Sequence, residues 1–136
     1  MLAPIVRSKL QERFSGMAIS FDAEDASVIA TIAPVHSSWE PIVVVDDGDE
    51  VTVFFGKFTH VHYGNHESVE LTKSVAESIA DDVANELSLV FADQVEAFNC
   101  WGYFGVGGLR AYGSQGFLSK LVFGENGRLW SGNPSH

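Results

Sequence analysis

The segment from residue 67 to residue 92 constrains the fold most, because apolar side chains recur along it at helical spacing. Neither glycine nor proline interrupts it, and polar side chains fill the positions between the apolar ones. Glu67 and Glu70 lie near its start, where the helix dipole favours negative charge. The apolar positions are Val75, Ala76, Ile79, Ala80, Val83, Ala84, Leu87 and Val90. We therefore expect one long amphipathic helix that packs its apolar face on a sheet.

A second, shorter helix is predicted over residues 4–15. Pro4 suits the first turn of a helix, and Gly16 suits its end. Its apolar stripe consists of Ile5, Val6, Leu10 and Phe14.

Four strands are expected between the two helices. The two central ones flank the turn Asp46-Asp47-Gly48-Asp49-Glu50 and are expected to form an antiparallel hairpin. Gly56 is expected to bend the last strand, which residues 58–63 then continue. The expected strands are 18–21, 27–33, 42–45 and 51–63.

The region after the long helix is predicted to add two or three strands. Residues 95–101 and 115–123 alternate as strands do, and the glycine-rich segment 101–108 indicates a bent strand pair or a loop against aromatic rings. Residues 125–128 predict a turn, and residues 131–136 a frayed tail. The order of elements favours a single α+β domain over residues 1–136, with a largely antiparallel sheet.

The charge is strongly negative and unevenly distributed. The 136 residues carry 18 acids against 8 Lys and Arg, a formal net charge of −10. Residues 16–100 alone hold 16 acids against Lys57 and Lys73, a balance of −14. This composition excludes tight nucleic-acid binding, which needs clustered Lys and Arg. The acids either keep the protein dispersed or form a docking surface for a basic protein. For that surface the hairpin turn offers Asp46, Asp47, Asp49 and Glu50.

An aromatic segment near the C-terminus is a second candidate contact surface. Tyr, Trp and Arg dominate the residues that carry binding energy in protein interfaces. Such a segment serves a foreign partner or a homodimer equally well. Its candidate contact residues are Trp101, Tyr103, Phe104, Arg110 and Tyr112.

Three histidines within seven residues form a candidate metal site. On a strand, His60 and His62 project to the same face, so the two imidazoles are placed to share a divalent metal ion. His66 or Glu67 from the following turn is the expected third ligand. The alternative is a histidine pair that packs on an exposed sheet face.

The run His60-Val61-His62 with Glu67 resembles part of the first metal-binding motif of the cupin family. That resemblance implies a metal ion held by these side chains. The chain departs from the cupin pattern in that Gly56 stands one residue too early. It also departs because a long helix follows and the Pro-Gly-His run of the second motif is absent.

The N-terminus and the single Cys100 bear on the compartment. The apolar run before Arg7 is too short for a signal peptide, and no stretch approaches the roughly 20 apolar residues that span a bilayer. A lone cysteine is compatible with a reducing compartment. We expect a cytoplasmic protein that binds neither membrane nor nucleic acid.

The function expected from the sequence is that of a non-enzymatic protein-binding module with no cofactor. In size and charge over the whole chain it is similar to the bacterial immunity proteins of nuclease toxins, and no motif carries that likeness. One alternative is a metal-binding protein or metal-dependent enzyme that uses His60 and His62. Another is a small-molecule pocket between the long helix and the sheet.

Overall fold

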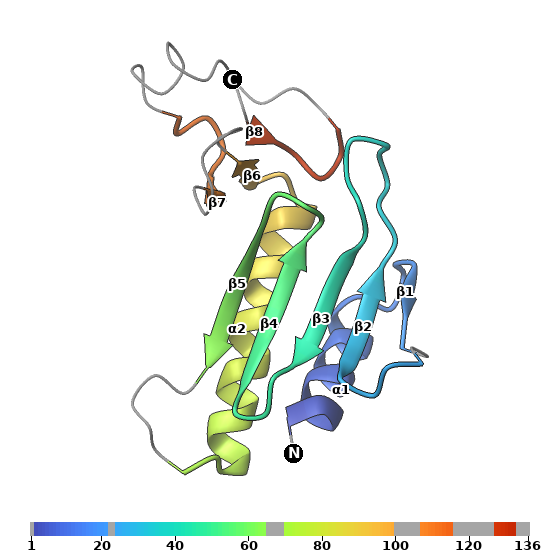
Figure 1. Ribbon diagram of the computed structural model, residues 1–136, viewed down its shortest axis with the longest axis vertical. Coiled ribbons are helices and arrows are strands. Elements are labelled where there is room, and N and C mark those ends of the chain that lie inside the picture. The colour runs from blue at the N-terminus through green and yellow to red at the C-terminus, as the bar shows by residue number, and fades with distance from the viewer. Residues whose placement is uncertain (1, 22–23, 65–69, 100–106, 116–126, 133–136) are drawn as a thin grey trace.

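A computed structural model of the chain describes residues 2–21, 24–64, 70–99, 107–115 and 127–132. Two helices, α1 (Leu2–Arg13) and α2 (Lys73–Phe91), cover one face of a five-stranded antiparallel sheet. A small three-stranded sheet lies at one end of this pair of layers (Figure 1). The expected α+β fold with a largely antiparallel sheet is confirmed.

The larger sheet is a meander in which each strand pairs with the next one along the chain. The predicted hairpin around Asp46–Glu50 is confirmed. The prediction that Gly56 only bends a continuous strand was wrong. Gly56 has a φ of 57°, and the amide of Phe58 bonds the carbonyl of Phe55, so the chain reverses there. The strands are β1 (Ile19–Ser20), β2 (Val28–Ile32), β3 (Ile42–Asp46), β4 (Glu50–Phe55) and β5 (Thr59–Gly64).

Both helices differ from the expected bounds at their ends. Helix α2 begins at Lys73 and not at residue 67, because the Thr72 side chain caps it by accepting a hydrogen bond from the amide of Val75 at 3.2 Å. Residues 70–72 precede the helix. Helix α1 begins two residues earlier than predicted and still holds Pro4 in its first turn, where proline costs no hydrogen bond.

The core lies between the helices and the sheet. Side chains from alternate positions of the strands point inward, as the period of two requires, and meet the apolar stripes of both helices. Apolar side chains fill this layer, which is where the sequence placed a small-molecule pocket. Fully buried members include Val6 and Leu10 of α1, Val83 and Leu87 of α2, and Val53 and Phe55 of β4.

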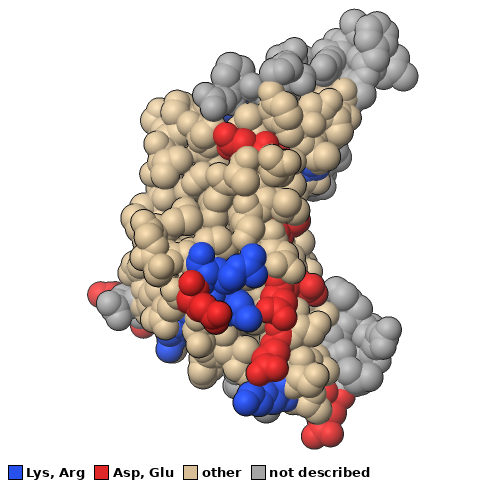
Figure 2. All heavy atoms as spheres, turned by 180° about the vertical axis from the view of Figure 1, so that it is seen from behind, with Lys and Arg blue, Asp and Glu red and all other residues tan. Residues whose placement is uncertain are grey.

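The solvent side of the helices carries mixed charge. Figure 2 shows Lys and Arg gathered beside Asp and Glu on this side of the molecule. Lys9 of α1 pairs with Asp81 of α2 at 3.0 Å, so the basic N-terminal residues lie against the acidic face of the long helix. Surface pairs of this kind contribute about 0–1 kcal/mol each.

The smaller sheet has the order β7-β6-β8, with β6 (Val95–Asn99), β7 (Gly107–Ala111) and β8 (Gly127–Arg128). Gly127 and Arg128 pair with β6, so the turn predicted over 125–128 was wrong at its last two residues. In the predicted tail, the amide of Ser131 bonds the Asp93 carboxylate at 3.2 Å. Residues 116–123 and 133–136 lie outside the described residues, and so do their predicted strand and tail. Across the described ranges, no helix has the length and apolar character needed to cross a membrane.

Candidate metal centre

His60 and His62 lie on the same face of β5, as their spacing predicted, and both are exposed. Their ring centroids are 5.2 Å apart, with the rings nearly perpendicular. The expected third ligands, His66 and Glu67, lie outside the described residues. On its other side His60 packs on the ring of Phe54, at a centroid distance of 5.5 Å. It therefore forms part of an aromatic contact on the sheet surface.

The β3–β4 hairpin brings carboxylates to His62. The amide of Asp47 donates to the carbonyl of Glu50 at 2.9 Å and closes the turn. Gly48 takes a φ of 97° within it, and its amide bonds the Asp46 carboxylate at 2.8 Å. The register between β4 and β5 then places Glu50 and His62 on the outer side of the sheet, one strand apart.

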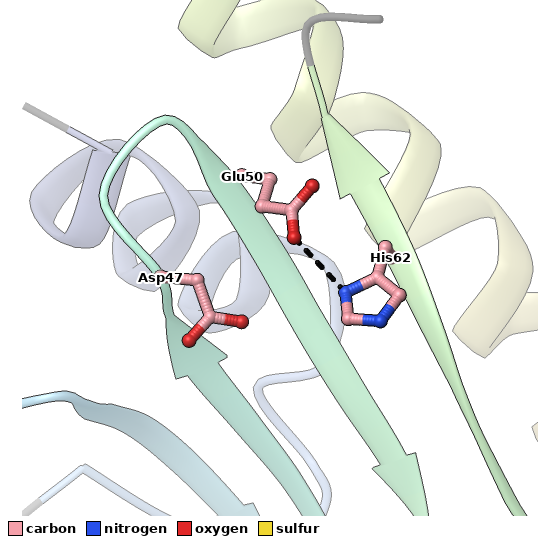
Figure 3. Close-up of side chains that lie close together, drawn as sticks. All are labelled: Asp47, Glu50 and His62. Atoms are coloured by element: carbon pink, nitrogen blue, oxygen red, sulfur yellow. Dashed lines mark ion pairs between the residues drawn. The ribbon is translucent and has the colours of Figure 1, made fainter.

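Asp47, Glu50 and His62 point toward one another (Figure 3). The Nδ1 atom of His62 lies 3.1 Å from a carboxylate oxygen of Glu50. One ligand atom from each of the three residues lies within 4.8 Å of the other two. The side chains of His62 and Glu50 are 47 % and 35 % exposed, so an ion from solvent reaches them directly.

Thr52 contacts both Asp47 and His62. Its cross-strand partner is His62, and it is 2 % exposed although it faces the outer side of the sheet. Its hydroxyl donates to the Asp47 carboxylate, and its oxygen lies 2.9 Å from Nδ1 of His62. Since the hydroxyl proton goes to Asp47, Nδ1 of His62 is the donor toward the oxygen of Thr52. Thr52 thereby orients both a carboxylate and an imidazole.

Gly64 gives the Glu50 side chain room. It stands directly opposite Glu50 in the β4–β5 register. A Cβ atom on Gly64 would lie 2.7 Å from the Cβ of Glu50 and 3.1 Å from one carboxylate oxygen. Only glycine at this position leaves Glu50 in the place from which it contacts His62.

The chemistry of the group is that of a mixed nitrogen and oxygen ligand set. Imidazole nitrogen with carboxylate oxygen suits Zn²⁺ and related transition metals, whereas Ca²⁺ and Mg²⁺ prefer oxygen alone. The sequence supplied all three residues as candidates, but it placed Asp47 and Glu50 in a partner surface and His62 in a metal site. Only the register between the strands brings these three residues together.

The other candidates are dispersed. Asp46 caps its own turn, and Asp49 is exposed at the hairpin tip. Arg110 lies in β7, where its side chain is 15 % exposed and pairs with Glu96. Tyr112 follows β7 and is 41 % exposed. Trp101, Tyr103 and Phe104 lie outside the described residues.

Comparisons with protein-family models, with curated proteins and with solved structures found no match to this chain.

Proposed function

We propose that the protein binds a divalent transition-metal ion such as Zn²⁺ through Asp47, Glu50 and His62. The observation that carries the proposal is the approach of three ligand atoms, from three different residues, to within 4.8 Å of one another. Zn²⁺ holds nitrogen and oxygen ligands at about 2.0–2.2 Å, which puts neighbouring ligand atoms roughly 3.3 Å apart. An ion at this site would replace the proton that Nδ1 of His62 carries, and the 3.1 Å between that nitrogen and the Glu50 carboxylate oxygen is close to this spacing.

The surroundings favour a cation. The hairpin turn holds four carboxylates in five residues, which concentrate negative potential at this end of the sheet. Thr52 donates a hydrogen bond to the Asp47 carboxylate, and outer hydrogen bonds of this kind orient metal ligands in proteins. Three protein ligands leave a coordination position for water or for a group from another molecule.

Calorimetric titration of the chelator-treated protein with ZnCl₂ tests the proposal. We expect binding of one ion per chain, and His62→Ala to weaken it at least about tenfold. His60→Ala is the matched control, since it removes the neighbouring imidazole and leaves the three ligands in place. If His60→Ala weakens binding as much as His62→Ala, the two histidines share the ion and the proposed ligand set is wrong.

A second pair of variants tests the carboxylate ligands, and each of the two variants removes one negative charge. Asp47→Asn removes a ligand, and Asp49→Asn removes the same charge from the exposed tip of the same hairpin. We expect loss of affinity in the first variant and little change in the second. Equal effects mean that Zn²⁺ responds only to the overall negative potential. If the unaltered protein gives no heat and also retains no zinc in equilibrium dialysis, the site is refuted altogether.

A further inference from the structure

The face of the five-stranded sheet that points away from the helices carries a row of aligned side chains, of which Val43 and Phe54 are apolar. Figure 1 shows α1 and α2 together behind the sheet, and no described element in front of it. We call this side the outer face. Cross-strand pairing aligns one outward residue from each strand. The row runs Ser20, Thr31, Val43, Phe54 and His60.

Phe54 is the most prominent apolar side chain of this row. It is 40 % exposed, although it lies within β4 between the buried residues Val53 and Phe55. Isolated exposed apolar residues need no explanation, but Phe54 adjoins Val43 and the ring of His60. Aromatic side chains, phenylalanine included, are enriched in the cores of protein interfaces.

A shallow hollow extends the row at the β1 end. It measures about 400 Å³ and is lined mainly by small side chains. Ser20 and Thr31 belong both to the row and to the hollow, so the two features are continuous. The remaining lining residues are Ala18, Ile19, Ala33 and Pro41. A methyl-bearing side chain from another molecule fits a depression of this kind.

The outer face is acidic at the end formed by the β3–β4 hairpin, whereas Lys57 in the turn between β4 and β5 pairs with Glu40 at 3.7 Å. The outward-facing residues of the described strands include no Lys or Arg, and the acidic hairpin tip forms one end of the face. Glu50 lies four residues from Phe54 on the same side of β4, which is about 14 Å along a strand. A ligand that covers the face therefore meets apolar surface at one end and carboxylates at the other.

We propose that the outer face docks a basic polypeptide segment in extended conformation. Its apolar side chains would cover Phe54 and the hollow, and Arg or Lys about four residues further along would meet the hairpin acids. Charge complementarity selects this occupant over a second copy of the chain, because each copy carries −10. The basic end of the segment would meet Asp47 and Glu50, which are also proposed metal ligands, so the test is made without metal ions; the apolar end depends on Phe54 and the hollow, which are not part of the metal site.

A labelled peptide, Leu-Ser-Val-Ser-Arg-Ser-Arg, tests the proposal because in extended form it presents two apolar and two basic side chains on one side. We expect saturable binding by fluorescence anisotropy in EDTA, weakened by added salt.

Phe54→Ser should lower affinity at least about fivefold. Leu89→Ser is the matched control, since Leu89 is 43 % exposed on α2. Ala33→Trp, which fills the hollow from an exposed position, should also lower affinity.

Three outcomes overturn the proposal. One is equal loss of affinity in Phe54→Ser and Leu89→Ser, which places the peptide elsewhere. Another is equal binding of a peptide with Glu in place of Arg, which removes the argument from charge. The third is dimerisation of the free protein, seen by analytical ultracentrifugation and abolished by Phe54→Ser, which assigns the face to a second copy. Because EDTA removes metal ions, none of these outcomes bears on Zn²⁺ binding.

Discussion

Arg110 and Glu96 form a buried ion pair across the β6–β7 ladder, with Nε of the arginine 2.6 Å from a carboxylate oxygen. The Glu96 side chain is fully buried and that of Arg110 is 15 % exposed. The guanidinium also lies over the ring of Phe98, 4.3 Å from its centroid. Arg110 is therefore the charged partner of a buried carboxylate within the smaller sheet.

Arg110→Ala is expected to destabilise the protein by about 3–5 kcal/mol, because it leaves the Glu96 carboxylate buried without its partner. Arg13→Ala is the control: Arg13 is exposed and bonds Asn85 and Ser88 of α2. Its loss should cost about 1 kcal/mol or less. Urea denaturation at neutral pH measures both variants. A cost near 1 kcal/mol for Arg110→Ala would show that the pair contributes no more than a surface contact.

Gly64→Ala is expected to weaken Zn²⁺ binding, since the added methyl group displaces the Glu50 side chain that contacts His62. Gly16→Ala adds the same methyl group where nothing lies within 4 Å and should leave affinity unchanged. Calorimetric titration of both variants with ZnCl₂ provides the comparison. Unaltered affinity in Gly64→Ala would mean that Glu50 is not a ligand.

Glu86→Gln is expected to stabilise the protein at neutral pH. Burial raises the pKa of the Glu86 carboxyl, so the folded state favours its protonated form more than the unfolded state does. The contribution of this group to stability is therefore present below the ordinary pKa of a glutamate. It is lost as the pH rises through the raised pKa of the folded state.

The gain from Glu86→Gln should accordingly disappear below about pH 4. Glu77→Gln, at an exposed position of the same helix, removes an equal charge and serves as the control. Thermal unfolding of the three proteins at pH 7 and at about pH 4 measures the difference. A gain that is the same at both pH values would contradict burial of the charge as its cause.

Leu87→Ala is expected to destabilise the protein by about 2–5 kcal/mol, because Leu87 is fully buried and its removal leaves a cavity. Leu89 lies two residues further along α2 and is 43 % exposed, so Leu89→Ala should change stability by about 0.5 kcal/mol or less. Chemical denaturation separates the two. Similar values for the pair would mean that α2 is rotated relative to the sheet.

The sequence predicted those parts of the fold that depend on local pattern. The apolar spacing from Val75 to Val90 identified the face of α2 that is buried, and the acidic turn identified the β3–β4 hairpin. The start of α2 was missed because the cap at Thr72 outweighs the helix propensity of the residues before it. The reversal at Gly56 was missed because glycine permits both a bend and a turn.

The sequence predicted the residues of the candidate site, but it did not predict that Asp47, Glu50 and His62 lie together. Period two correctly placed His60 and His62 on one face. The approach of Glu50 to His62 depends on the register between β4 and β5, which no local pattern specifies. Arg110 was expected at a partner surface, but the ladder between β6 and β7 turns it toward Glu96.

The meander has a consequence for synthesis on the ribosome. All strands of the larger sheet pair with sequence neighbours, so they are able to form as soon as residue 64 has emerged. Helix α2 covers their inner face and ends only at Phe91. Its Asn85 accepts a hydrogen bond from Arg13 of α1, which lies 72 residues earlier in the chain. Until that helix is made, Val53 and Phe55 face water, and the nascent chain passes through a stage prone to aggregation.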